Sequence, residues 1–154
     1  MDRAFHQAAP WISRSVLAFG ALQFGIIGAV NFKEPVLMAY NHGLGMWSET
    51  AITMTRLQFG ILPLAIACIA LYCVFVPRRF MEGLGLLLFI SAATLGGYAL
   101  GMGIDGSNAD SRLLLQSAAF DALIYAIGVL VEWRRRLRDP LMVAPDLTPI
   151  VARG

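Results

Sequence analysis

The stretch LQFGILPLAIACIALYCVFV, residues 57–76, contains no charged side chain and fills most of an apolar segment at residues 50–76. A helix needs about 20 mostly apolar residues to cross the ~30 Å hydrocarbon core of a bilayer, so this segment predicts a transmembrane helix. Three further apolar segments occupy residues 15–30, 83–104 and 113–133. The sequence therefore predicts an all-α polytopic membrane protein, in which four transmembrane helices form a bundle.

The overall composition leads to the same fold class. Of the 154 residues, 58% are hydrophobic and 14% are charged, and the mean hydropathy is +0.67. Soluble domains average about 45–50% apolar and about 25% charged residues. The composition excludes a cytosolic enzyme, a nucleic-acid-binding module and a disordered chain, and the net charge of +2 gives no reason to expect a nucleic-acid partner. The expected surroundings are the lipid bilayer, and the expected location is the bacterial inner (plasma) membrane.

The basic residues predict how the chain is oriented. Nine of them belong to the N-terminal segment, the turn between the second and third helices, and the C-terminal tail, whereas three belong to the opposite side. Positively charged residues stay in the cytoplasm, so both termini are expected there. This divides the chain into a cytoplasmic segment 1–14, a transmembrane domain 15–133 and a cytoplasmic tail 134–154. The tail is expected to be disordered after residue 138, because it contains three prolines and no apolar period.

The potential metal ligands are too few and too scattered to form a site. Cys68 and Cys73 lie five residues apart in one apolar segment, so a helix turns their thiols to different sides. His42 lies in the loop 31–49 with two isolated carboxylates, which is not a metal-binding spacing. We therefore expect neither a metal nor another cofactor.

Two charged residues lie inside the apolar segments. Arg56 follows Glu49 by seven residues, and Asp121 lies eight residues into the fourth segment. Counting at about 1.5 Å per residue places both at a depth of ~10–12 Å from the same membrane face. A charge in hydrocarbon costs about 2.5–3.5 kcal/mol, so an ion pair between Arg56 and Asp121 would remove two penalties together. Such a pair has one of two roles. It fixes the register of the bundle, or it is functional and anchors a ligand head group or carries a proton.

Further polar side chains are expected near these two charges. Gln23, Gln58, Gln116 and Tyr98 lie in the outer halves of the predicted helices, and Glu49 opens the second one. Such residues form hydrogen bonds between membrane helices or contact a ligand. The candidate ligand site therefore comprises these side chains: Arg56, Asp121, Gln58, Gln23, Tyr98 and Glu49.

Small residues predict where helices approach each other closely. Gly97 and Gly101 form a G-x-x-x-G pattern in the third helix, and Gly25 with Ala29 repeats this spacing in the first. Such positions allow close backbone contact in membranes. Packing within one chain is the favoured interpretation, and packing between two chains is the alternative.

Three of these features together resemble a family of small bacterial four-span membrane proteins described only as a domain of unknown function. The features are Glu49 followed by TRLQFG at 55–60, the stretch GYALGMGIDG at 97–106, and Asp121 in the fourth helix. The resemblance covers residues 15–135. The family usually has Arg directly after the first glycine of the second stretch, whereas this chain has Tyr98. The resemblance implies the four-helix fold and no particular activity.

The sequence favours a non-catalytic function and leaves two alternatives open. The first hypothesis is an integral membrane subunit or scaffold that packs against another membrane complex or against itself, because small-residue faces are abundant and no catalytic constellation is present. The alternative is a membrane enzyme or binding protein for a lipid-like small molecule, which would use a polar site at Arg56 and Asp121. The second alternative is a small transporter with Asp121 as its titratable group. Whether the chain is an enzyme stays undecided.

Overall fold

The computed structural model describes residues 2–41, 48–106 and 109–138, and within these ranges the chain is helical apart from short turns and contains no strand. The long α-helices are α1 (Asp2–Lys33), α4 (Leu62–Phe75), α5 (Phe80–Asp105) and α6 (Ala109–Arg138). The shorter elements are α2 (Pro35–Asn41), α3 (Glu49–Thr55), the π-helical η1 (Arg56–Ile61) and the 3-10 turn η2 (Pro77–Arg79). The all-α prediction is confirmed.

Four helical stretches are long and apolar enough to cross a membrane. Each has 27 or 28 residues, and their bounds are Gln7–Lys33, Glu49–Phe75, Pro77–Ile104 and Asp110–Leu137. At 1.5 Å per residue each measures about 40 Å, which exceeds the hydrocarbon thickness of a bilayer. The prediction of four membrane-spanning helices is therefore confirmed.

The outer helices extend beyond the predicted apolar segments. The first helix begins at Asp2, so most of the segment 1–14 is the first part of α1. The last helix continues to Arg138, so the first five residues of the segment 134–154 belong to α6. The part of the tail for which disorder is expected, residues 139–154, lies outside the described residues.

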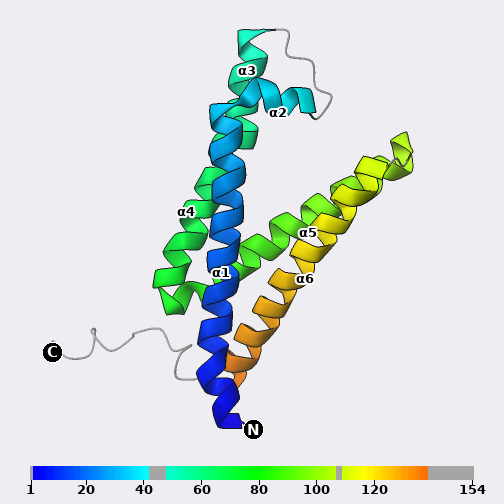
Figure 1. Ribbon diagram of the computed structural model, residues 1–154. Coiled ribbons are helices and arrows are strands. Elements are labelled where there is room, and N and C mark those ends of the chain that lie inside the picture. The colour runs from blue at the N-terminus through cyan, green and yellow to red at the C-terminus, as the bar shows by residue number, and fades with distance from the viewer. Residues whose placement is uncertain (1, 42–47, 107–108, 139–154) are drawn as a thin grey trace, which may run out of the picture.

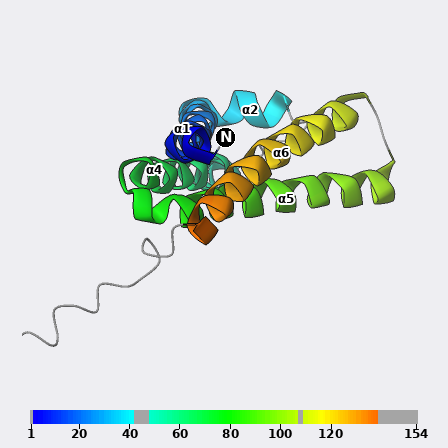
Figure 2. The same ribbon diagram turned by 90° about the horizontal axis from the view of Figure 1, so that it is seen from below.

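The long helices associate as two pairs. Helix α1 packs along η1 and α4, whereas α5 packs along α6. The two pairs meet at the end of the molecule where α1 begins and α6 ends, and from there they diverge (Figures 1 and 2). The buried core lies at this meeting point and combines residues of all four long helices: Leu17, Ala70, Cys73, Val74, Phe80, Leu84, Leu87 and Tyr125.

Close backbone contact holds α1 against the second span. A Cβ atom built on Gly60 would lie 3.0 Å from the Cα of Phe32, and one built on Gly28 would lie 2.8 Å from the carbonyl oxygen of Gly60. The π-helical turn η1 surrounds this contact, and in it the N–H of Leu62 donates to the carbonyl of Leu57. Because Pro63 has no N–H and clashes with the carbonyl four residues before it, the wider turn accommodates the proline without ending the helix.

Candidate functional site

Three side chains of α1 and α6 form a short hydrogen-bonded chain. The amide nitrogen Nε2 of Gln23 donates to Oδ2 of Asp121 at 2.7 Å. The hydroxyl of Tyr125, which is fully buried, donates to Oε1 of Gln23 at 2.8 Å. Both polar atoms of the Gln23 amide are thus engaged, which fixes its N–H side toward the carboxylate of Asp121.

A cavity of about 230 Å³ lies beside this chain, between α1, α5 and α6. Three of the predicted site residues, Gln23, Tyr98 and Asp121, line it, so the structure brings together side chains from three separate helices. The remaining wall combines apolar side chains with hydroxyls, and its members are Phe24, Ile27, Ile90, Ser91, Thr94, Leu114, Ser117 and Ala118. The cavity is therefore amphipathic, with a carboxylate among its polar groups.

The predicted ion pair between Arg56 and Asp121 is wrong. No ion pair joins them in the described part of the chain, because the carboxylate of Asp121 is bonded to Gln23 and Arg56 lies elsewhere. Arg56 is exposed and lines a second cavity of about 330 Å³ together with Glu49, Ile52 and Thr53. The physical reason is the divergence of the helix pairs, which carries α6 away from the second span at this end (Figure 1).

Gln58 does not reach the cavity either. It lies on η1 with its side chain exposed, and Gln116 is likewise exposed on α6. Of the polar side chains expected near the two charges, the structure therefore brings together Gln23, Tyr98 and Asp121.

The prediction that Gly97 and Gly101 pack helices within the chain is wrong. A Cβ atom added at either position would meet no atom within 4 Å, so no neighbouring helix approaches them. Gly25 does face the second span, but an added Cβ would lie 3.8 Å from the Cβ of Ala67, which is ordinary van der Waals contact. Its surroundings form an apolar groove of about 440 Å³ between α1 and α4.

Other glycines make the close helix contacts that were expected of Gly25, Gly97 and Gly101. Added Cβ atoms would come within 3.0 Å of neighbouring side chains or backbone at Gly20, Gly28, Gly60, Gly83 and Gly128. These positions lie where α1 crosses the second span or where the two pairs meet. Single glycines rather than a repeated motif mark these crossings, so the spacing rule alone could not find them.

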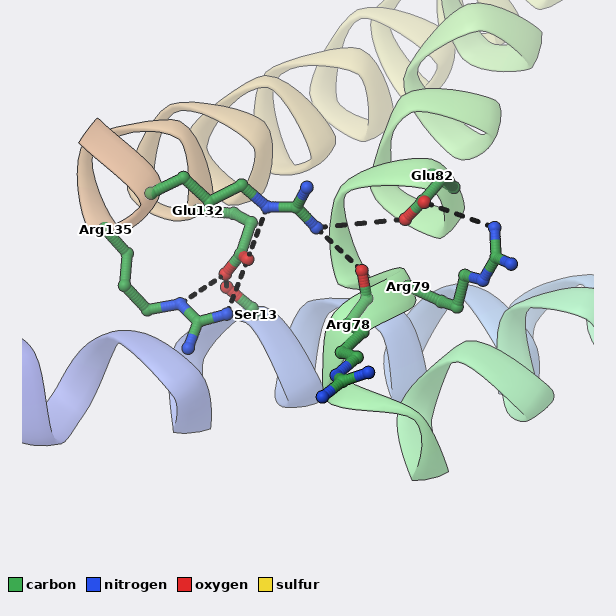
Figure 3. Close-up of polar contacts among 7 residues, drawn as sticks. Ser13, Arg78, Arg79, Glu82, Glu132 and Arg135 are labelled. Atoms are coloured by element: carbon green, nitrogen blue, oxygen red, sulfur yellow. Dashed lines mark hydrogen bonds and ion pairs between the residues drawn. The ribbon is translucent and has the colours of Figure 1, made fainter. Parts of the chain in front are cut away.

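A buried charge cluster at the meeting point of the pairs was missed by sequence reasoning. Glu132 is fully buried and accepts hydrogen bonds from Arg135 at 2.9 and 2.7 Å, from Arg136 at 3.2 Å and from Ser13 at 3.2 Å (Figure 3). We call these four residues the Glu132 cluster. Because Ser13 belongs to α1 and the others to α6, the cluster ties the two pairs together.

The Glu132 cluster also reaches the turn between α4 and α5. Arg136 donates to the backbone carbonyl of Arg78 at 2.9 Å and lies 3.8 Å from a carboxylate oxygen of Glu82 (Figure 3). The guanidinium of Arg135 lies 6.0 Å from the ring centre of buried Phe80, and that of Arg14 lies 5.9 Å from the same ring. Ion pairs, hydrogen bonds and cation–π contacts therefore join the first part of α1, the turn between α4 and α5, and the last part of α6 at one end of the molecule.

A sequence signal for this cluster did exist. Glu132 is an acid inside the fourth apolar segment, and arginines follow it at the i+3 and i+4 positions, where side chains on a helix meet. The same arginines also satisfy the positive-inside rule. The orientation of the chain therefore accounts for them without a buried acid as their partner.

The described residues contain no group of three or more His, Cys, Asp or Glu side chains that could hold a metal ion. His42 lies outside the described residues. Comparison with known protein families, curated proteins and solved structures gives no match for this chain.

Proposed function

We propose that this chain is a non-catalytic integral membrane subunit that packs through α5 against a helix of a neighbouring protein. The neighbour is a second copy of this chain or a subunit of another membrane complex. The proposed location is the bacterial inner membrane, with both termini in the cytoplasm, in keeping with the distribution of basic residues. The proposal agrees with the resemblance to the four-span family of unknown function.

The observation that carries the proposal is a contrast between two sets of glycines. Five glycines of the bundle are pressed against neighbouring helices, whereas Gly96, Gly97, Gly101 and Gly103 of α5 have open space where a Cβ would be. A glycine inside a helix costs about 0.5–1 kcal/mol relative to alanine, and close helix contact is what compensates for this cost in a membrane. These four glycines of α5 make no such contact inside the chain, which favours a helix from outside.

The position of these glycines supports the same conclusion. They lie in the half of α5 that has diverged from the α1–α4 pair, where the helix packs along α6 alone (Figure 1). Gly97 and Gly101 are four residues apart and therefore form one stripe on the helix surface. Leu100 and Ile104 beside them are 70% and 82% exposed, which supplies apolar surface for the neighbour.

The test is to fill the stripe with large side chains. Because an added Cβ meets nothing within the chain, Gly97→Leu and Gly101→Leu should leave the fold intact and should not lower its thermal midpoint. They should reduce the assembled mass of the protein extracted in mild detergent, as measured by light scattering after size-exclusion chromatography.

Ala65→Leu, at an exposed position of α4, provides the matched control and should leave the assembly intact. Co-purified proteins identify a hetero-subunit, whereas a doubled mass of this chain identifies a second copy. Unchanged assembly in both glycine variants would show that the stripe faces lipid, and the proposal would fail.

A further inference from the structure

The carboxylate of Asp121 is unusual in having no positive partner within the membrane-spanning part of the chain. It lies eleven residues after Asp110, at which the fourth span begins, and this corresponds to a depth of about 16 Å. No ion pair of the described residues includes it, and its one hydrogen bond there comes from the neutral amide of Gln23 to Oδ2. A charge at such a depth is costly unless it is paired, so the carboxylate favours a cation beside it.

The wall of the neighbouring cavity contains acceptors and no cation. None of its lining residues is Lys, Arg or His, whereas Ser91, Thr94, Tyr98 and Ser117 contribute hydroxyl oxygens beside Asp121. Hydroxyls and a carboxylate accept hydrogen bonds from an ammonium group, which donates only. An anionic or zwitterionic head group would bring a negative charge with nothing in this wall to balance it.

The size and apolar lining of the cavity indicate what the rest of the ligand is. A volume of about 230 Å³ is smaller than the ~300–1,000 Å³ of pockets that enclose a whole drug-sized molecule, so it accommodates a head group. Phe24, Ile27 and Leu114 form part of the wall, and Ile27 and Leu114 are 42% and 38% exposed. An alkyl chain attached to the head group can therefore continue along these side chains into the lipid.

We propose that the cavity between α1, α5 and α6 binds the protonated amine of an amphiphilic molecule, with Asp121 as its counter-ion. Gln23, held by Tyr125, keeps one carboxylate oxygen in place, and this leaves the other oxygen for the ammonium group. The rings of Phe24 and Tyr98 add a favourable surface for a cation. This site is independent of the assembly surface on α5.

The test compares two probes of equal chain length, octylamine, which is protonated at neutral pH, and octanol, which is neutral. The protein is placed in phosphatidylcholine nanodiscs, and binding is measured by calorimetry against empty nanodiscs. Octylamine should bind the parent protein at least tenfold more tightly than it binds Asp121→Asn, and octanol should not distinguish the two proteins. The control Asp110→Asn removes an exposed carboxylate of the same helix and should keep the affinity for octylamine.

A second variant keeps the test decisive if Asp121→Asn does not fold. Ser117→Leu fills the cavity from an exposed position and leaves the carboxylate in place, so it should abolish octylamine binding. Competition by sphingosine, a lipid whose head group carries an amine and no phosphate, would identify a lipid as the source of the amine, and its absence would identify a free amphiphilic amine. Equal binding of octylamine and octanol, or unchanged octylamine affinity in both variants, would overturn the proposal.

Discussion

Replacing Glu132 by Gln tests whether the Glu132 cluster holds the two helix pairs together. The substitution keeps the size of the side chain but removes the buried negative charge that Arg135 and Arg136 share. The side chain of Arg135 is only 10% exposed, so its charge would then lack compensation in a place that water hardly reaches. Removing one member of a buried ion pair typically costs about 3–5 kcal/mol, and we expect a loss of about this size.

Glu82→Gln provides the matched control for this experiment. Glu82 also pairs with two arginines, at 3.4 and 3.8 Å, but its side chain is 52% exposed. Ion pairs exposed to this extent contribute about 0–1 kcal/mol, so the control should cost little. The difference between the two variants therefore measures the effect of burial and not the loss of one negative charge.

The free energy of unfolding is measured by titrating the protein in mild detergent micelles with a denaturing detergent and following helicity by circular dichroism. A double variant, Glu132→Met with Arg135→Met, should recover much of the loss, because two apolar side chains replace a buried pair at little cost. If Glu132→Gln costs no more than Glu82→Gln, the cluster contributes no more than a surface ion pair and the reasoning is refuted.

Two further predictions concern packing and orientation. Gly60→Leu should cost about 1–3 kcal/mol in the same titration, because an added Cβ would lie 3.0 Å from the backbone of Phe32, whereas Gly85→Leu, where a Cβ meets nothing, should be near neutral. Reporter fusions at residue 80 and after residue 138 should give cytoplasmic activity and fusions near residues 42 and 108 external activity, and an external C-terminus would contradict the orientation proposed from the basic residues.

The number of membrane spans and their approximate positions could be predicted from sequence because hydropathy depends on composition alone. The predicted segment 50–76 matches the span Glu49–Phe75 to within one residue at each end, and the segment 83–104 ends with the span Pro77–Ile104 but begins six residues after it. The ends were less accurate, since the helices α1 and α6 continue into polar sequence that a hydropathy criterion assigns to the flanks.

The partners of the polar side chains could not be predicted in the same way. Counting residues gives the depth of a side chain only if the helices stand parallel, and it does not give the direction in which the side chain points. The prediction that Arg56 pairs with Asp121 failed because the two helix pairs diverge and are not parallel (Figure 1). Gln23 and Tyr98 could be predicted as candidates because a polar side chain in a membrane helix needs a hydrogen-bond partner, whichever direction it faces.

The divergence of the two pairs also affects the lipid around them. The four long helices lie together at the end where α1 begins and spread apart toward the other end (Figures 1 and 2). In a bilayer this shape would occupy unequal lateral area in the two leaflets. A wedge of this shape relieves packing stress in a bilayer that is convex on its wider side and adds stress in a flat one. The neighbouring helix that we propose against α5 would widen this side further, and assembly would then be coupled to membrane curvature.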